Sequence, residues 1–466
     1  MLIPKPTNTW SESIVNYINK TVPFKFRSIE FSFDLSQGLF SSACVDAGTQ
    51  FLLKVFSRIL DEDIAAHRPL PRRALDAGCG TGVIGICAAL AIKAVAGEEG
   101  LYLRCQDRDE LARLVTSHNA AKNNIHPTML EAFTEPLLAG PENGKWDLIL
   151  TNIPAKTGNA VLEDFVSRSV SLLNPEGRVI MVVVNTLADF FREAIAAVGA
   201  KLLLEEKSPG HTVFAYRGEA ESPTLPVNIA PGFLTHYPFY VRAKPVCTIE
   251  GIEIGLETVQ LASVFAKPGG AILAAAKLLR RLGREKISCA GPVLVHEPGQ
   301  GFFTNWLLAF LRDEANRAQK LVLSGRNILS LEAARHNAGS VKGAEAKTVL
   351  AVDLQLGKEA LLSAGCGQFA FIATFPEILP QPKAAKASQD ADQLTAIWNS
   401  LPPLLAEGGL FLIAFTSSDA ERFDRKKPTG FTRLGSIKRD GFCALAYQKQ
   451  RVISNGSATI PWRIPQ

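Results

Sequence analysis

The stretch RRALDAGCGTGVIGI, Arg72–Ile86, decides the fold of the first part of this 466-residue chain. A short apolar run ends at Asp76, glycines follow at Gly78, Gly80 and Gly82, and an amphipathic segment begins. Glycine permits positive φ angles and lets a ligand approach the backbone closely. The pattern therefore predicts a strand, a glycine-rich turn and a helix, with a ligand site at the turn. The spacing alone also fits a dinucleotide-binding turn.

Short β-branched runs alternate with longer amphipathic ones around this stretch, from residue 70 to 217. This order predicts a mainly parallel sheet with helices on both faces. The predicted strands are Arg73–Ala77, Leu101–Cys105, Trp146–Thr151, Arg178–Val184, Lys201–Glu205 and Thr212–Arg217, and helical patterns lie between them at Val83–Val95 and Glu110–Asn123.

The same alternation resumes after Glu221–Gly232, where three prolines indicate a linker. Gln381–Gln393 is predicted to be an exposed loop or a weak helix start. The second set of predicted strands comprises Pro292–His296, Lys320–Ser324, Thr348–Asp353, Gln368–Thr374, Leu410–Thr416, Phe431–Ile437 and Phe442–Gln448.

The two halves resemble each other, which indicates a tandem duplication. We expect two tandem Rossmann-like domains with doubly wound, mainly parallel sheets, at residues 1–220 and 232–450, the second one diverged. Three pairs of similar segments occur in the same order: TQFLLKVF at Thr49 with TVQLASVF at Thr258, SHNAAKNN at Ser117 with RHNAGS at Arg335, and LLNPEGRVIMVVVNT at Leu172 with LLAEGGLFLIAFTSS at Leu404.

Composition places the chain in the ordinary globular class, with 47% hydrophobic and 20% charged residues. At roughly 150 residues per domain, the length points to two or three domains. The most apolar stretch, Val83–Val95, contains Lys93 and is shorter than the about 20 residues of a bilayer helix. The first residues show no secretory signal. We therefore expect a cytoplasmic protein without a membrane segment, and a monomer is compatible with these observations.

The eight cysteines form no C-x-x-C pair and do not cluster with the seven histidines. We expect reduced, mostly buried cysteines and no metal site. Charge is unevenly distributed: residues 1–220 hold 22 Lys and Arg against 25 Asp and Glu, a net charge of −3, whereas residues 221–466 hold 28 against 20, a net charge of +8. The basic clusters at Lys277–Lys286 and Arg422–Lys427 fit either a polyanion-binding face or an ordinary solvated surface.

The segment DAGCGTG, which starts at Asp76, resembles the first motif of class I S-adenosylmethionine-dependent methyltransferases. This resemblance implies that the turn from Gly78 to Gly82 packs against the amino-acid part of the cofactor. It also implies that Asp107, in CQDRD, binds the ribose hydroxyls, and that Glu131, near the end of the third strand, contacts the adenine amine. Asp107 could instead cap the next helix.

The segment KWDLILTNIPAKTG is similar to the N-P-P-F/Y motif of methyltransferases that act on planar amines. Asn152 and Pro154 match it, whereas Ile153 and Ala155 depart from it. The resemblance assigns Asn152 and Pro154 to the catalytic site, with Asn152 holding the target amine, and Lys156 follows as a substrate-binding candidate. Without the aromatic residue, the stacking platform must come from elsewhere, or the acceptor is not a stacked base. Asn152 could also simply cap the loop.

The upstream run Phe31–Leu53 resembles the segment that precedes the catalytic core in tandem-domain ribosomal RNA guanine methyltransferases of the small methyltransferase domain superfamily. There the run closes over the cofactor, which implies that Asp46 lies near its methionine end and makes Phe40 a substrate-binding candidate. In that family the active copy is the C-terminal one. Here the motif-bearing copy comes first.

The second half lacks the motifs. Phe302 and Phe303 stand where the helix should start, Gly325 replaces the ribose-binding carboxylate, and ATFPE replaces the Asn-Pro motif. We therefore expect the second copy to be a degenerate methyltransferase domain that does not bind S-adenosylmethionine. The resemblance to tandem-domain enzymes, in which a degenerate copy helps to bind RNA, implies the same role for this copy.

These features predict an S-adenosylmethionine-dependent methyltransferase that modifies an exocyclic amine of guanine in ribosomal RNA. One alternative is an enzyme that methylates a protein glutamine amide or a small molecule. Another is a non-catalytic scaffold built on two methyltransferase-like folds.

Overall fold

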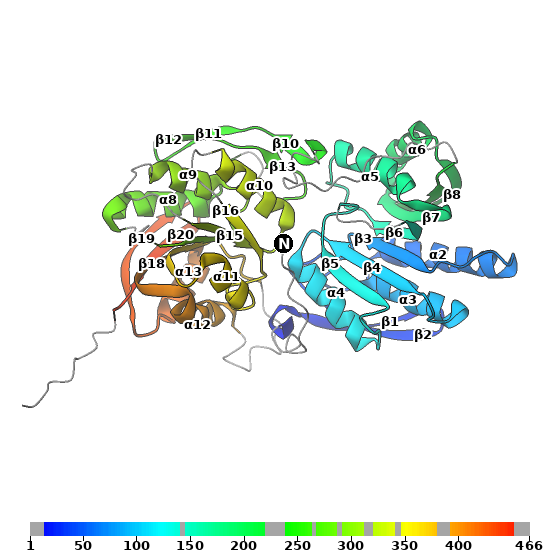
Figure 1. Cartoon of the computed structure of the whole chain (residues 1–466), viewed down its shortest axis with the longest axis horizontal. Coiled ribbons are helices and arrows are strands. Elements are labelled where there is room, and N and C mark those ends of the chain that lie inside the picture. The colour runs from blue at the N-terminus through cyan, green and yellow to red at the C-terminus, as the bar shows by residue number, and fades with distance from the viewer. Residues whose placement is uncertain are drawn as a thin grey trace, which may run out of the picture.

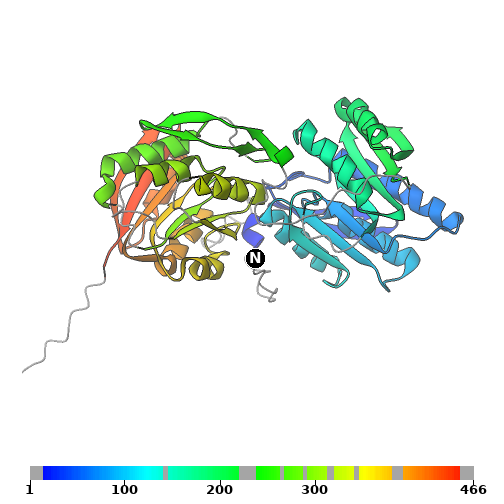
Figure 2. The ribbon, with the colours of Figure 1, turned by 45° about the horizontal axis from the view of Figure 1, so that its top comes forward.

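Two seven-stranded sheets flanked by helices lie side by side in the chain (Figure 1; Figure 2). The computed structural model describes residues 14–139, 145–219, 238–262, 267–286, 291–311, 320–340, 346–379 and 392–451. We call residues 14–219 the first domain and residues 238–451 the second domain. The predicted linker at 221–232 lies outside the described residues, as does most of 381–393.

The first sheet has the strand order β5-β4-β3-β6-β7-β9-β8. Strands β3 to β7 are parallel, and β9 runs antiparallel to both of its neighbours. Because β4 and β6 flank β3 on opposite sides, the carboxyl ends of these strands border the crevice where open α/β sheets bind ligands. The bounds are β3 (Arg73–Ala77), β4 (Tyr102–Asp107), β5 (Leu130–Thr134), β6 (Trp146–Asn152), β7 (Leu173–Val184), β8 (Lys201–Lys207) and β9 (His211–Arg217).

Helices cover both faces of this sheet, which explains why its central strands are apolar on both sides. Side chains of α2 and α3 form one buried cluster with the sheet, and those of α5 and α6 form another. The helices are α2 (Ala47–Ala65), α3 (Val83–Ala96), α4 (Glu110–Lys122), α5 (Asn159–Ser171) and α6 (Ala188–Ala197).

The second sheet repeats the first, with the strand order β16-β15-β14-β17-β18-β20-β19. The predicted pair of doubly wound, mainly parallel sheets is confirmed. Its strands are β14 (Val293–His296), β15 (Leu321–Gly325), β16 (Ala346–Leu350), β17 (Phe369–Thr374), β18 (Leu405–Thr416), β19 (Phe431–Arg439) and β20 (Phe442–Lys449). Its helices are α8 (Gly270–Leu282), α9 (Phe302–Phe310), α10 (Ile328–Gly339), α11 (Lys358–Gly365), α12 (Gln393–Leu404) and α13 (Ser417–Arg425). In the described ranges no helix combines the length and apolarity needed to cross a membrane.

Each domain also carries short antiparallel strands that the sequence analysis left unassigned. In the first domain β1 (Lys20–Phe26) pairs with β2 (Ile29–Leu35), whose Phe33 and Leu35 are fully buried. In the second domain β11 (Val246–Ile249) pairs with β12 (Ile252–Gly255), and β10 (Val241–Ala243) pairs with β13 (Thr258–Val259).

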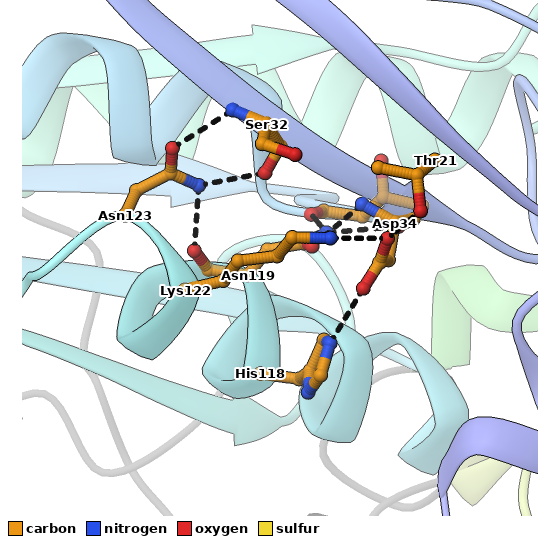
Figure 3. Close-up of polar contacts among 8 residues, drawn as sticks. Thr21, Ser32, Asp34, His118, Asn119, Lys122 and Asn123 are labelled. Carbon is orange, nitrogen blue, oxygen red and sulfur yellow. Dashed lines mark hydrogen bonds and ion pairs between the residues drawn. The ribbon is translucent and has the colours of Figure 1, made fainter.

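An asparagine in helix α4 ties the first hairpin to the glycine turn (Figure 3). Asn119 Nδ2 donates to the carbonyls of Asp34 and Thr81, and its Oδ1 accepts from Asp34 N at 2.8 Å. The Asp34 carboxylate in turn contacts His118 at 2.7 Å and Lys122 at 2.6 Å.

The second domain repeats this arrangement with other residues. Asn337, in α10, bonds the carbonyls of Glu257 and Gln300 and accepts from Glu257 N at 2.8 Å. His336 and Lys244 contact the Glu257 carboxylate. The pairing of SHNAAKNN with RHNAGS therefore reflects a structural equivalence.

One of the three predicted segment pairs is wrong. Thr49 lies in helix α2, whereas Thr258 lies in strand β13. The counterpart of α2 is α8, which packs on the second sheet as α2 packs on the first. Similar apolar letters produced the false match, because a strand and a helix can share a short run of them. The pair beginning at Leu172 and Leu404 does correspond, since it forms β7 and β18 in the same place of each sheet.

Candidate functional site

The turn between β3 and α3 has the left-handed backbone that the glycines predict. The φ angles are +82° at Gly78, +55° at Gly80 and +83° at Gly82. A Cβ on Gly82 would lie 2.8 Å from the Thr116 side chain, so this position requires glycine. A Cβ on Gly80 would meet nothing within 4 Å, which leaves the backbone of the turn open to a ligand.

Asp76 is the fourth of the five residues of β3 and lies fully buried just before this turn. Its Oδ2 accepts from Gly85 N at 2.8 Å, whereas its Oδ1 is buried and lacks a hydrogen-bond partner among the described residues. Burial raises the pKa of Asp76 to about 7. A buried carboxylate oxygen without a donor is well suited to bind a cationic ligand group.

Asp107, at the end of β4, faces the turn from the neighbouring strand. Its Oδ2 accepts from Gly80 N and its Oδ1 from Asp109 N, both at 3.1 Å. Asp109, not Asp107, is the N-cap of α4, because its side chain accepts from Leu111 N at 3.0 Å. The capping role that Asp107 could have played is therefore filled, and each Asp107 oxygen keeps a further lone pair for a ligand hydroxyl.

Asp46 and Asn152 lie far apart in the sequence and meet at this edge of the sheet. Asp46 caps α2 by accepting from Thr49 N at 3.0 Å, and Ser41 Oγ donates to its other oxygen at 3.2 Å. Asn152, the last residue of β6, donates from Nδ2 to Asp46 Oδ1 and to Thr49 Oγ1, both at 3.2 Å.

This contact fixes the orientation of the Asn152 amide. A carboxylate only accepts hydrogen bonds, so the amide nitrogen must face Asp46. Among the described residues nothing donates to Asn152 Oδ1, which leaves that oxygen available as an acceptor. The hydrogen bonds of the Asn152 side chain go to Asp46 and Thr49, and none among the described residues goes to the loop that follows β6. The alternative that Asn152 only caps this loop is therefore not supported.

The predicted catalytic-site residue Pro154 and the two substrate-binding candidates, Lys156 and Phe40, lie on the surface. Pro154 and Lys156 are exposed, and the Pro154 carbonyl already accepts from the Thr157 backbone and hydroxyl. Phe40 is 71% exposed. It precedes Ser41, which bonds Asp46, so an exposed aromatic ring stands in the segment that borders the site.

Glu131 does not lie where the sequence analysis expected it. It is the second of the five residues of β5 and pairs with Arg104, three positions before Asp107 in β4. Its exposed carboxylate accepts from the Tyr102 hydroxyl at 3.1 Å. The expectation that it lies near the end of the strand is wrong, and Thr134 occupies that end, opposite Asp107.

Two contributions, those of Thr49 and Arg326, escaped sequence reasoning. Thr49 was seen only as part of an apolar repeat, although its place one turn after a helix-capping Asp46 could have indicated a shared site. Arg326, from the second domain, donates to the Gly38 carbonyl at 3.2 Å and lies 3.3 Å from Asp109. No local signal reveals such a contact between residues so far apart in the chain.

The described residues contain no group of three or more potential metal ligands. The cysteines that the structure describes are free thiols, and Cys79, Cys87, Cys105 and Cys443 are buried.

The first domain matches a known family over most of its length. Residues 30–203 match the family model of the methyltransferase small domain. Residues 30–203 form a methyltransferase small domain. This domain type belongs to the class I S-adenosylmethionine-dependent methyltransferases, as the motifs at Asp76 and Asn152 predicted.

Curated relatives of the small domain act on ribosomal components, according to their names. Ribosomal RNA small subunit methyltransferase C of Actinobacillus pleuropneumoniae is 28% identical over 170 residues, which are 36% of this chain and 46% of the relative. Ribosomal protein L11 methyltransferase of Thermotoga neapolitana is 33% identical over 133 residues, which are 28% of this chain and 44% of the relative. The chain thus matches less than half the length of these relatives.

A solved structure matches both domains. The T. Thermophilus 16S rRNA N2 methyltransferase RsmC, in complex with AdoMet and guanosine, aligns with 94% of this chain and 99% of its own, with a TM-score of 0.58 and 18% sequence identity. This likeness shows that the two-domain fold is shared.

Proposed function

We propose that this chain is an S-adenosylmethionine-dependent methyltransferase that modifies an exocyclic amine of guanine in ribosomal RNA. The observation that carries the proposal is the contact of Asn152 with Asp46, which turns the amide nitrogen toward Asp46 and leaves the amide oxygen without a donor among the described residues. The first domain, residues 1–220, is the catalytic unit, and residues 232–450 form a degenerate unit that binds substrate. A reaction on ribosomal RNA places the protein in the cytoplasm.

The residues around the turn fit the methyl donor. The unpartnered Oδ1 of Asp76 suits an ammonium group, and the open backbone at Gly80 allows close approach. The Asp107 carboxylate suits a ribose diol, since carboxylates accept strong hydrogen bonds. When bound, the cofactor supplies an electrophilic methyl group on a sulfonium.

The chain's own contribution is mainly positioning. Asn152 Oδ1 accepts a hydrogen bond from the target amine and turns its lone pair toward the crevice, while Asp46 and Thr49 lock the amide in that orientation. Holding two reactants in an aligned geometry supplies much of the rate enhancement of such displacements. Phe40 provides the aromatic surface that Ala155 does not, and the exposed Lys156 offers a positive charge.

The second domain supports an RNA substrate through its charge. Residues 221–466 carry a net charge of +8, with 28 Lys and Arg against 20 Asp and Glu. Lys277, Arg280 and Arg281 are exposed on α8. Basic surfaces of this kind bind phosphates and make RNA binding sensitive to salt.

Transfer of a tritiated methyl group from S-adenosylmethionine tests the proposal. Ribosomal subunits, free ribosomal RNA and ribosomal protein are offered separately to the wild-type chain, to Asn152→Ala and to Asn159→Ala, an exposed control on α5. Label in the RNA of the wild-type and control reactions, with a loss of about a hundredfold in Asn152→Ala, is expected because misplacing the acceptor costs that much. Full activity of Asn152→Ala would overturn the assignment of the acceptor site.

A protein amide is the second candidate acceptor. Ala155 stands where an aromatic platform would stack a base, and the match to a ribosomal protein methyltransferase favours a protein substrate. Label in the protein fraction alone would select this candidate. No label in any fraction, with a folded sample, would instead favour the scaffold alternative.

A further inference from the structure

A cavity of ≈ 300 Å³ lies at the carboxyl ends of the central strands of the second domain, with Tyr17 of the first domain in its wall. This volume is at the lower end of small-molecule sites, which span about 300–1,000 Å³. The cavity occupies the place that the glycine turn and its neighbours occupy in the first domain. The equal strand orders and registers give the counterparts: Gly269 for Asp46, Val295 for Asp76, Glu297 for Gly78, Gly299 for Gly80, Gly325 for Asp107 and Phe375 for Asn152.

The turn keeps its open shape although its sequence has changed. The φ angles are +52° at Glu297, +55° at Gly299 and +99° at Gly301. A Cβ on Gly299 would meet nothing within 4 Å, as at Gly80 in the first domain. Glu297 holds a left-handed conformation that non-glycine residues rarely adopt and that tends to occur at ligand sites.

Glu297 also supplies a carboxylate close to the position where Gly325 stands in place of an aspartate equivalent to Asp107. Its Oε1 accepts from Arg326 N at 2.9 Å, and a Cβ on Gly325 would lie 3.2 Å from the same oxygen. The Glu297 carboxylate therefore lies next to the place that the Cβ of an aspartate at position 325 would occupy. Its Oε2 has no hydrogen-bond partner among the described residues, and the side chain lines the cavity. Burial raises the pKa of Glu297 to about 7.

The charge of the lining limits what can bind. The lining contains three carboxylates, those of Glu297, Asp353 and Glu377, and one guanidinium, that of Arg326. Phosphate groups are therefore disfavoured by like-charge repulsion. Val295 replaces Asp76, so the partner for an amino-acid ammonium is missing. Apolar walls suited to a flat ring come from Ile272, Phe302, Leu354 and Ile397.

We propose that the second domain binds an unphosphorylated nucleoside, with the Glu297 carboxylate accepting hydrogen bonds from the ribose hydroxyls. The cavity has the place, size and carboxylate of a nucleoside site, and it lacks the group that would hold a methionine moiety. The two domains then share one scaffold and hold different ligands. This inference does not depend on the acceptor assigned to the first domain.

Calorimetric titration with adenosine tests the inference, using the full chain with Asp107→Asn to weaken the first-domain site. We expect one equivalent of adenosine to bind. AMP and 2′-deoxyadenosine should bind at least about tenfold more weakly. The phosphate of AMP is repelled by the carboxylates of the cavity, and 2′-deoxyadenosine lacks one of the hydroxyls that donate to Glu297. Adding Glu297→Gln should weaken adenosine binding by at least about tenfold with an unchanged melting temperature.

A second variant tests the cavity from another wall. Ile272→Trp fills it from helix α8, and Lys277→Trp on the exposed face of the same helix is the matched control. Adenosine binding should be lost in Ile272→Trp and kept in Lys277→Trp. Absence of binding to the Asp107→Asn chain, equal binding of AMP, or unchanged affinity after Glu297→Gln would each overturn the proposal.

Discussion

Asp109 and Asn327 face each other across the boundary between the two domains as an isolated antiparallel bridge. The residue after each one donates its backbone N–H to the carbonyl of the residue before the other, at 2.9 Å in both directions. Each also caps the helix that follows it, α4 or α10. The two copies of the duplicated unit therefore meet through the same turn, in a reciprocal contact like that of a twofold dimer.

Replacing Arg326 should loosen this boundary. Its guanidinium lies 3.3 Å from Asp109 and bonds the Gly38 carbonyl. Arg326→Met should lower the free energy of unfolding by about 1.5–3 kcal/mol, the range for hydrogen bonds to charged groups. Burial raises the pKa of Asp109 to about 6 and Arg326 opposes this rise, so the loss should be larger at pH 8 than at pH 5. Urea unfolding at both pH values measures it.

The control for this measurement is Arg335→Met, in helix α10, which begins two residues after Arg326; the partner of Arg335 is Glu332, one turn away on the same helix. Its cost should be below about 0.5 kcal/mol, as for i,i+3 ion pairs within a helix. Equal losses for the two variants would contradict the role of Arg326 at the boundary.

Asp107→Ala should weaken donor binding about ten- to hundredfold, because one carboxylate supplies hydrogen bonds worth about 1.5–3 kcal/mol. The chain should still fold, since β4 and α4 keep their other contacts. Calorimetry with S-adenosylhomocysteine measures the affinity, and Asp189→Ala, whose side chain is 88% exposed, is the control. A retained affinity in Asp107→Ala would remove Asp107 from the site.

Local patterns predicted the parts of the site that lie within one strand-turn-helix unit. The turn at Gly78 was readable because it depends on a few neighbouring residues. Glu131 was misplaced because a five-residue strand leaves its ends undefined in the sequence. The first hairpin was missed because Pro23 interrupts its alternating pattern, and proline argues against a strand. Contacts such as Arg326 with Gly38 depend on tertiary packing alone.

Phe40→Ala should impair acceptor binding and leave stability unchanged. The ring is 71% exposed, so its removal opens no cavity. Base stacking on an aromatic side chain contributes about 1–3 kcal/mol, so KM for the RNA should rise about five- to hundredfold with little change in donor affinity. Phe40→Trp should restore binding. Equal kinetics for Phe40→Ala and the wild type would show that the acceptor stacks elsewhere or not at all.

Asp76 should give the stability of the chain a distinctive pH dependence. Burial raises its pKa from 3.8 to about 7, so between these values the unfolded state is ionised while the folded state still binds a proton. Stability contributed by the protonated form is therefore lost as the pH rises from about 4 to 7. The difference in unfolding free energy between the wild type and Asp76→Asn should fall over this window, on the order of 1 kcal/mol per pH unit.

Glu205→Gln provides a control of opposite sign, because hydrogen bonds from Arg192 lower the pKa of Glu205. The unfolding free energy of the wild type should exceed that of Glu205→Gln at neutral pH. This difference should shrink only as the pH falls below about 4.5, the ordinary pKa of glutamate. Asp76→Asn should also weaken donor binding at pH 7.5, because the neutral amide offers no charge to an ammonium group. At that pH the substitution should not lower the unfolding free energy. A pH-independent difference for Asp76→Asn would mean that the buried carboxyl is ionised throughout, with its second oxygen paired to a group such as bound water.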